Sequence, residues 1–299
     1  MTMVVMWNII LPLMALLVAV FFLGLSRKVT ARIQRRHGPP IYQPVIDIVK
    51  LFSQDEHVSH GVLFDLGILM ALGGSLVTVL FIPAGGIHPL SSSGDLIVVI
   101  YLMLISPLGM ALAAGASANP NASIGVSRKL IMAFGYEVPF LLAMLTVMMH
   151  LNTTSLLEIT QSQQGSLLNW GLIRWPIPLI ATFLILPAML GIRPFDVVTA
   201  PQEISSGPLV EFGGKYLAIA ELQSALHIYI VIALFVDLFL GGGANIGTFL
   251  IKVLFVFLLG IFINAVFPRF RIDQGLRYCL KWPTLIALIG LILVLIIGS

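Results

Sequence analysis

The sequence predicts an all-α, polytopic membrane protein of about eight transmembrane helices, with an interfacial amphipathic helix after the first span. Hydrophobic residues make up 59% of the 299 residues and charged residues only 10%, whereas soluble domains contain about 25% charged residues. The apolar residues are gathered into stretches that approach the roughly 20 residues needed to cross a bilayer. Because no connection is long enough to hold a soluble domain, we expect residues 1–299 to form a single integral membrane domain.

Eight stretches have the length and composition of a span. They lie at residues 5–25, 62–82, 95–117, 128–150, 175–192, 216–240, 247–267 and 282–298. The first has no basic region before it and no small-residue cleavage site after it. We therefore expect it to stay in the protein as a helix and not to be removed as a signal peptide.

The basic residues predict the orientation of these spans. Fourteen of the sixteen Lys and Arg residues fall in four connections on the same side, and the opposite side has only Arg174. Cytoplasmic loops carry the excess of Lys and Arg, so both termini are expected outside the cytoplasmic membrane. This topology accounts for the net charge of +3 better than binding to nucleic acid does.

The segment at residues 26–61 is too polar to span a membrane and too apolar for a plain linker. Apolar residues recur at helical spacing opposite Asp47 and Lys50, which predicts a helix lying along the interface. The helix is expected to start after Gly38-Pro39-Pro40. The pattern fits a membrane-surface anchor and a docking platform for a partner protein equally well. The apolar residues are Ile41, Val45, Ile48, Val49 and Phe52.

The segment from Arg193 to Glu221 holds four of the thirteen acidic residues: Asp196, Glu203, Glu211 and Glu221. Glu221 lies about two turns into a span, and the other three lie in the loop before it. A charged group at mid-bilayer costs roughly 2.5–3.5 kcal/mol, so acids kept there indicate ion movement or coupling. Ordinary solvated carboxylates are the alternative for the loop acids alone.

Glu137 is the acid expected deepest in the membrane. It lies about nine residues into the span at 128–150, roughly 14 Å from its end at 1.5 Å per residue. Pro139 frees a backbone carbonyl one turn earlier and leaves room for water or a polar partner. A protonated, hydrogen-bonded packing group is the alternative, but an apolar residue would pack there without the desolvation cost.

Two further charged residues lie near the outer face. Asp237 and Lys252 flank the turn at Gly241-Gly242-Gly243, and a tight turn would bring them together as a structural ion pair. Asp65 and Asp95 lie at helix starts, where negative charge suits the helix dipole, and we assign them no function.

No residue pattern indicates a redox cofactor or a metal in this chain. The single cysteine, Cys279, excludes an iron–sulfur cluster, a zinc–thiolate site and an internal disulfide. The histidines lack the paired spacing of a haem protein: His227 is alone in its span, and His57 and His60 lie at the interface. We therefore expect a non-redox membrane subunit that works only inside a larger oxidoreductase.

Four motifs in the connections and the fourth span point to one family. Residues 27–39 (RKVTARIQRRHGP) with Asp47 to Phe52, Tyr136-Glu137-Val138, Arg193 to Asp196 with Gln202-Glu203, and Pro268 to Gln274 occur in order. Together they resemble the membrane-anchor component of the respiratory complex I family, the one designated H or 1. In that family this component joins the membrane arm to the peripheral arm, and the resemblance covers nearly the whole chain.

The run from Gly207 to Gly214 (GPLVEFGG) resembles the Gly-Pro-x-x-Glu-Tyr-Ser-Gly run of energy-converting, membrane-bound nickel–iron hydrogenases and formate hydrogenlyases. Where those relatives place further acids, this chain has Thr199, Pro201 and Ser206. The family's acids carry over only to the loop positions Asp196, Glu203 and Glu211 and the membrane positions Glu137 and Glu221. The missing acids favour a complex whose electrons end on protons or sulfur in the peripheral arm over a quinone-type charge relay.

The resemblance implies a ferredoxin-linked complex that couples electron transfer to proton or sodium translocation. Its peripheral large and small hydrogenase-like subunits and an iron–sulfur subunit would dock on the cytoplasmic loops, and antiporter-like subunits would be membrane neighbours. Iron–sulfur clusters and a nickel–iron centre are expected in those partners. The loop residues expected to serve docking are Arg27, Arg32, Arg35, Arg36, Arg193, Arg269, Arg271 and Asp273.

Three other functions compete with this one. A quinone-chamber subunit of NADH:quinone oxidoreductase and a sulfur-reducing relative of the hydrogenase complex share the family but differ in the terminal acceptor. A stand-alone secondary transporter fits less well, since such proteins often show internal repeats and the two halves here show none. The identity of the terminal electron acceptor and that of the coupling ion are determined by neighbouring chains.

Overall fold

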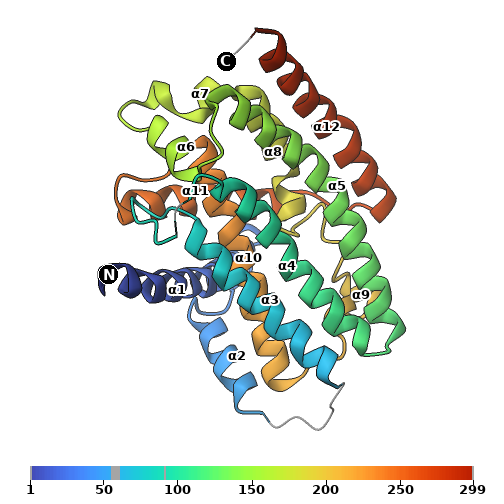
Figure 1. Cartoon of the computed structure of the whole chain (residues 1–299). Coiled ribbons are helices and arrows are strands. Elements are labelled where there is room, and N and C mark those ends of the chain that lie inside the picture. Colours follow the sequence, from blue (N-terminus) through green and yellow to red (C-terminus); the bar gives the residue numbers. More distant parts are fainter. Residues whose placement is uncertain (1, 55–60, 91, 298–299) are drawn as a thin grey trace. The chain divides into compact units, whose positions relative to one another are not determined.

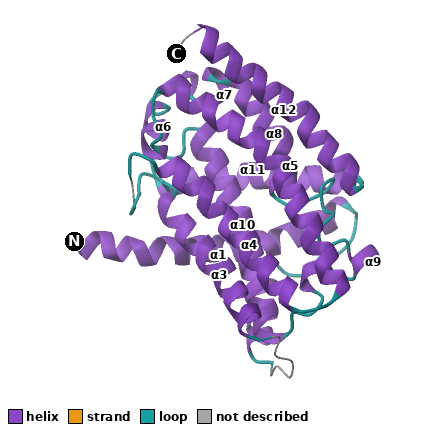
Figure 2. Cartoon of the chain, turned by 45° about the vertical axis from the view of Figure 1, so that its right-hand side comes forward, coloured by secondary structure: helices purple, strands orange, loops and turns teal. Residues whose placement is uncertain are grey.

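The structure is a computed structural model that describes residues 2–54, 61–90 and 92–297, with the side chains of 2–5, 202 and 297 left aside. Within these ranges the chain folds into helices joined by loops, without a strand (Figures 1 and 2). The predicted all-α class is confirmed. The predictions about His57, His60 and the Gln202 side chain fall outside what is described.

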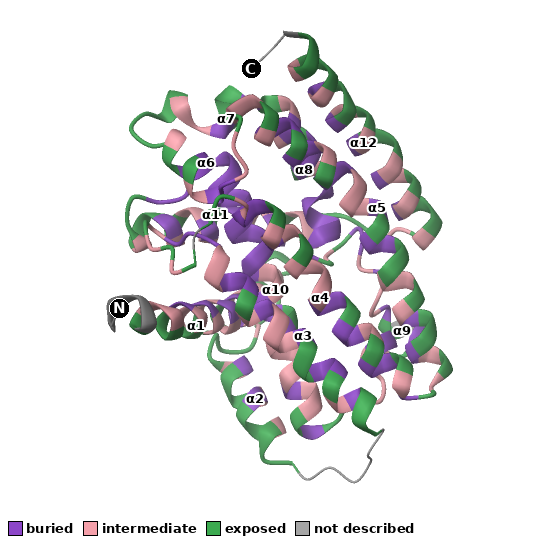
Figure 3. Ribbon diagram, viewed as in Figure 1, coloured by how far each residue is buried: buried purple, intermediate pink, exposed green. Residues whose placement is uncertain are grey.

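Seven helices of the described residues are long and apolar enough to cross a membrane. Large apolar side chains remain exposed along them, including Leu17 at 74% and Ile296 at 76%, and exposed positions recur along α12 (Figure 3). Lipid contact explains this exposure, and the chain is a multi-pass membrane protein. The helices are α1 (Thr2–Ile33), α3 (Val62–Phe81), α4 (Asp95–Ala116), α5 (Pro120–Leu151), α10 (Gly214–Phe239), α11 (Ile246–Val266) and α12 (Ile272–Ile297).

The span expected at 175–192 is shorter in the structure. Helix α8 (Pro176–Met189) has 14 residues, about 21 Å at 1.5 Å per residue, against a hydrocarbon core of about 30 Å. A bend at Trp175 separates it from the four-residue helix α7 (Gly171–Arg174). Pro176 supplies no N–H and so starts a helix instead of continuing one. α8 packs against α12 and α11, which lie in the same unit.

The predicted amphipathic helix is α2 (Gln43–Phe52), which follows an α1 that runs eight residues further than expected. Gly24 of α1 lies directly against the backbone of Ile41, so a Cβ there would clash. α2 buries Pro44 and Ile48, half-buries Leu51 and leaves four further apolar residues exposed, as an interfacial helix would. These are Val45, Ile46, Val49 and Phe52.

The chain divides into two compact units. Unit 1 comprises Met1–Leu80, Ile100–Leu130 and Asp196–Ile230, and unit 2 comprises Phe81–Val99, Ile131–Phe195 and Val231–Ser299. In unit 1, glycines let α3 and α4 approach closely: a Cβ on Gly67 would lie 2.5 Å from the backbone nitrogen of Ala113, and one on Gly109 would lie 2.6 Å from that of Ala71. Small residues at such contacts are typical of membrane helices.

Short helices fill the longer loops. In unit 2 they are α6 (Leu156–Ser162) and the 3₁₀ turn η1 (Leu167–Asn169), and in unit 1 they are α9 (Pro201–Ile204) and the 3₁₀ turn η2 (Gly207–Leu209). α9 and η2 lie within the acidic segment that the sequence singled out.

Candidate functional site

The acidic loop, residues 196–213, has an unusual backbone. Ala200, Ser205 and Ser206 adopt positive φ angles of 21°, 49° and 76°. Residues other than glycine in such conformations cost about 1–3 kcal/mol each and persist only where the surroundings hold them. Contacts outside the loop must therefore maintain its shape.

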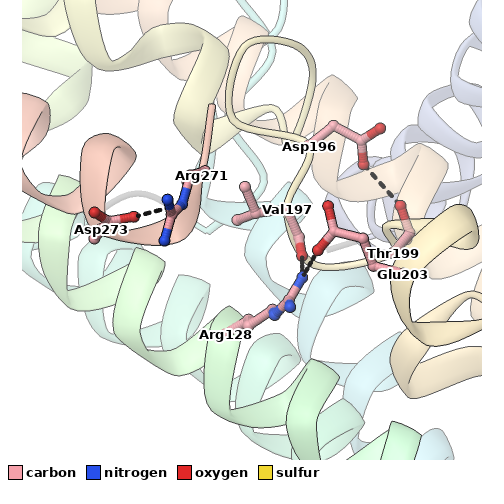
Figure 4. Close-up of polar contacts among 7 residues, drawn as sticks. All are labelled: Arg128, Asp196, Val197, Thr199, Glu203, Arg271 and Asp273. Atoms are coloured by element: carbon pink, nitrogen blue, oxygen red, sulfur yellow. Dashed lines mark hydrogen bonds and ion pairs between the residues drawn. The ribbon is translucent and has the colours of Figure 1, made fainter. Parts of the chain in front are cut away.

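The first part of α5 supplies one set of those contacts. The guanidinium of Arg128 donates through Nη1 to Oε2 of Glu203 at 2.8 Å and to the carbonyl oxygen of Val197 at 3.3 Å (Figure 4). Arg128 thereby joins the start of the loop to α9. The Glu203 side chain is 53% exposed, so it can meet solvent or a partner chain as well as Arg128.

Two further contacts attach the loop to α5. Nδ2 of Asn119, directly before the helix, donates to Oε1 of Glu211 at 2.5 Å. Gly125 lies against Gly207 and Pro208, and a Cβ on Gly125 would come within 2.5 Å of the Pro208 ring. The loop is thus held along α5 at residues 119, 125 and 128.

Asp196 has a local partner. Its Oδ1 accepts a hydrogen bond from Oγ1 of Thr199 at 2.7 Å (Figure 4). This bond closes the turn that leads into α9. Thr199 is one of the residues that replace the acids expected in hydrogenase relatives, and here it binds an acid instead of adding one.

The start of α10 is fixed to the first turn of α3. The Tyr216 hydroxyl donates to Oδ1 of Asp65, and the Tyr216 ring packs edge-on against Phe64 with ring centroids 5.0 Å apart. Phe64 also contacts Phe212 at the end of the acidic loop, with centroids 4.8 Å apart. Sequence reasoning assigned Asp65 only to the helix dipole and missed this bond.

Glu221 lies in α10, two turns beyond the acidic loop. Its Oε2 is buried and has no hydrogen-bond partner among the described residues. The charges of Arg27 and Asp47 act on it. Sequence reasoning placed Glu221 correctly in the span but did not connect it to α1 and α2.

Arg27 and Asp47 form a pair beside α2. Nη1 of Arg27 donates to Oδ2 of Asp47 at 2.7 Å, and Nε2 of Gln43 donates to Oδ1 at 2.9 Å. The Gln43 hydrogen bond and the Arg27 guanidinium lower the pKa of Asp47 from its ordinary value of 3.8. Arg27 was expected to serve docking, and here it is engaged within the chain.

Glu137 belongs to unit 2 and lies near the middle of the 32-residue helix α5. It is half-buried and makes no hydrogen bond within the described part of the chain. Gly135, two residues before it on the same helix, allows Leu276 of α12 to approach closely.

The other residues expected to serve docking are mostly at the surface. Arg271 and Asp273 form a weak ion pair at 3.5 Å with side chains 82% and 50% exposed (Figure 4), and Arg269 is partly buried. The backbone N–H of Arg193 donates to Oδ1 of Asn264 at 3.1 Å. Exposed basic side chains on these connections are available to a partner. They are Arg32, Arg35, Arg36 and Arg193.

Comparison with known proteins identifies the family of the chain. A family model described as NADH dehydrogenase matches residues 5–295, nearly the whole length. The chain belongs to the NADH dehydrogenase family. The predicted resemblance to the complex I family is therefore confirmed.

Three similar proteins match this chain over most of their own length. Hydrogenase-4 component C of Escherichia coli (strain K12) is 30% identical over 86% of this chain and 85% of its own. The H component of the NADH-quinone oxidoreductase of Protochlamydia amoebophila is 34% identical over 92% and 91%. A chain of the membrane-bound sulfane sulfur reductase, an archaeal respiratory membrane complex, is 42% identical with a TM-score of 0.92, covering 97% of this chain and 99% of that one.

One predicted contact in this member of the NADH dehydrogenase family is not formed. Asp237 and Lys252 make no ion pair, although both lie in unit 2. Nζ of Lys252 instead donates to the carbonyl oxygen of Leu240 at 2.6 Å and lies 4.2 Å from the ring centroid of Trp170. The glycine turn reverses the chain so that the Leu240 carbonyl faces Lys252. The sequence prediction considered side chains alone and could not foresee that a backbone carbonyl would bind the lysine.

The described residues contain no group of three or more His, Cys, Asp or Glu side chains placed to hold a metal ion. The acidic loop and the spans offer carboxyl groups, which can bind and release protons or attract cations.

Proposed function

We propose that this chain is the membrane subunit of an energy-converting oxidoreductase complex of the hydrogenase or sulfur-reductase type. It would anchor the peripheral redox arm and couple electron transfer to translocation of protons or sodium ions. The 42% identity to a chain of a sulfane sulfur reductase and the 30% identity to hydrogenase-4 component C support this branch. We further propose that both termini lie outside and the basic loops in the cytoplasm.

The attachment of the acidic loop carries this proposal. The loop is tied through Glu203 and Glu211 to the start of α5 and continues directly into α10. α5 carries Glu137 and α10 carries Glu221, so one segment reaches the two helices that hold the membrane acids. A redox event beside the loop that shifts its conformation would bias both helices, and a shift of population needs no redox group in this chain.

The acids have separate roles in this mechanism. Glu203 and Glu211 hold the loop in one conformation, and Glu137 and Glu221 exchange the translocated ion. The exposed arginines and Asp273 receive the peripheral large and small subunits and an iron–sulfur subunit. Those partners supply the iron–sulfur clusters and the nickel–iron or sulfur-reducing centre, and antiporter-like neighbours continue the ion path.

The intact complex in sealed vesicles tests the proposal. Glu137→Gln keeps the shape of the side chain but cannot exchange a proton, so ions moved per electron should fall by roughly tenfold or more. Assembly and electron transfer should persist. Glu203→Gln should reduce the ratio as well, because it weakens the bond to Arg128.

Glu158→Gln is the matched control, since Glu158 is an exposed acid that the mechanism does not use, and its ratio of ions moved per electron should equal that of the wild type. Unchanged ion movement per electron in both Glu137→Gln and Glu203→Gln would overturn the coupling role.

A second candidate function rests on the 34% identity to the H component of an NADH-quinone oxidoreductase. In that case the chain would help to enclose a quinone. Photolabelling of the complex with a quinone analogue separates the two functions. Saturable labelling of residues 26–61 or of the loop after Arg193 would favour the quinone role, and labelling that does not saturate would favour the hydrogenase or sulfur-reductase type.

A further inference from the structure

Near the end of α10, unit 2 contains a carboxyl group that the proposed mechanism does not use. Asp237 is 0% exposed, and neither of its oxygens has a hydrogen-bond partner in the described ranges. A buried carboxylate without a partner is very unfavourable, whereas the neutral acid avoids most of that cost. The carboxyl group of Asp237 therefore carries a proton in this conformation.

The backbone around Asp237 is satisfied by other groups. Nε2 of Gln163 donates to the carbonyl oxygens of Asp237 and Leu238 at 2.9 and 3.2 Å, and Oε1 of Gln163 accepts from the N–H of Gly241 at 3.0 Å. The indole N–H of Trp175 also donates to the Leu238 carbonyl at 3.2 Å. These bonds hold the end of α10 in place without any help from the Asp237 side chain.

Lys252 of α11 is the charged group whose field reaches Asp237 within the described residues. Its ammonium group is held by the Leu240 carbonyl and the Trp170 ring. The other titratable groups on neighbouring elements are bound elsewhere: Arg174 donates to the Ser162 carbonyl, and His150 packs on Trp175. A lysine side chain is flexible enough to exchange one acceptor for another.

From this arrangement we propose that Asp237 is a proton-binding site, which loads a proton while Lys252 is bound to the Leu240 carbonyl and releases it when Lys252 moves to the carboxylate. The loaded state contains a neutral acid and an ammonium ion, with a net charge of +1. The released state contains a carboxylate paired with the same ammonium ion, with a net charge of zero and one proton set free. The inference rests on the proposed coupling function and adds a site to it.

The surroundings suit a proton and not a metal cation. Hard cations take about six or more oxygen ligands, but the nearby carbonyls of Asp237, Leu238 and Leu240 already accept hydrogen bonds. Of these described oxygens, the two carboxyl oxygens of Asp237 have no hydrogen-bond partner. A proton needs one of them.

The test uses the intact complex in sealed vesicles with Asp237→Asn, Lys252→Met and the double variant. Asp237→Asn should assemble and transfer electrons, but protons released per electron should fall by roughly tenfold. The infrared band of a neutral carboxyl group should disappear in the same variant. Asp95→Asn is the matched control: Asp95 is also buried in unit 2 but accepts a hydrogen bond from the N–H of Ser92, and its removal should leave the proton yield unchanged.

The double variant distinguishes proton binding from a structural pairing of charges. If the two residues only balance each other, removing both charges restores proton release, and that result would overturn the inference. So would an unchanged proton yield in Asp237→Asn, or transport of sodium ions without protons.

If Asp237→Asn fails to assemble, Asp237→Glu is tested instead, because it retains an ionisable group. A shifted infrared carboxyl band with retained proton release is then expected, and an unshifted band overturns the site. Loss of ion movement in Glu137→Gln alone would leave the proposed function standing without this site.

Discussion

The carboxyl groups of the loops and those inside the spans differ in one respect. Among the described residues of unit 1, each acid outside the spans or in the first turn of one holds a specific partner within the chain, whereas the acids inside the spans have an oxygen, or the whole group, without one. The pairs are Asp47 with Arg27, Asp65 with Tyr216, Asp196 with Thr199, Glu203 with Arg128 and Glu211 with Asn119. Among the described residues, the acids inside the spans with unpartnered buried oxygens are Glu221 at Oε2 and Asp237. Glu137, which is half-buried, makes no hydrogen bond there either.

The difference separates positioning from exchange. An acid that accepts a hydrogen bond contributes about 1 kcal/mol to stability and fixes a segment. A buried acceptor that receives no hydrogen bond costs about 1–3 kcal/mol. Groups that destabilise the protein are retained for what they do. In the proposed mechanism the loop acids fix where the helices start, and the acids inside the spans exchange the ion.

The largest effect is expected when an unpartnered acid is removed. Glu221→Gln should leave assembly and the unfolding temperature close to those of the wild type, because no hydrogen bond to Oε2 is lost. Ion movement per electron should fall by roughly tenfold or more, since the amide cannot take up a proton. Proton release from vesicles with parallel measurement of electron transfer checks this. Normal ion movement in this variant would show that Glu221 is a packing residue, and the division between paired and unpaired acids would then not hold for it.

The spans were predictable because lipid forces every backbone group into helices and leaves a long apolar stretch in the sequence. Their exact ends were not. α1 extends to Ile33 because a helix can continue through Arg27 and Arg32 at the interface, where long basic side chains reach water. α8 is short because Trp175-Pro176 breaks the helix, a local effect that a hydropathy average removes.

The acids could be chosen from the sequence, but their partners could not. Asn119 meets Glu211 across 92 positions and Tyr216 meets Asp65 across 151. Such bonds depend on how helices pack, and no spacing rule predicts them. Arg128 entered the sequence analysis only as one of the fourteen basic residues that predict the orientation, although it binds Glu203.

A smaller effect is expected where the acidic loop touches α5. Gly125→Ala would place a Cβ 2.5 Å from Pro208 and 2.8 Å from Gly207, and such overpacking costs about 1–3 kcal/mol. Gly73→Ala in α3 is the matched control, since its Cβ meets nothing within 4 Å and alanine favours a helix by about 0.5–1 kcal/mol. Thermal unfolding of the solubilised complex should separate the two variants in opposite directions. Equal midpoints would mean that the loop is not held by α5 at this point.

A single partner bond gives a smaller change again. Tyr216→Phe removes the hydroxyl donor from Asp65 and should reduce stability by about 1 kcal/mol. Tyr42→Phe changes an exposed tyrosine directly before α2 (64% exposed) and should have no effect on the unfolding midpoint. Proton release per electron should be normal in both. A Tyr216→Phe complex that keeps its stability but loses ion movement would transfer Asp65 from the positioning acids to the exchanging ones.

The smallest effect concerns Asp47, whose pKa is lowered by the hydrogen bond from Gln43 and by the Arg27 guanidinium. A pKa lower in the folded state means that stabilisation is complete above the unfolded value, near 3.8, and is lost as the pH falls through the folded value. The contact between α1 and α2 should therefore loosen below about pH 4 and not above it. Exposed ion pairs contribute about 0–1 kcal/mol, so the change is modest. Hydrogen exchange of residues 43–52, corrected for the intrinsic rate, should show lower protection at acid pH in the wild type and no such pH dependence in Asp47→Asn. Equal pH dependence in both proteins would show that this acid does not position α2, and the division between paired and unpaired acids would then hold only at the acidic loop.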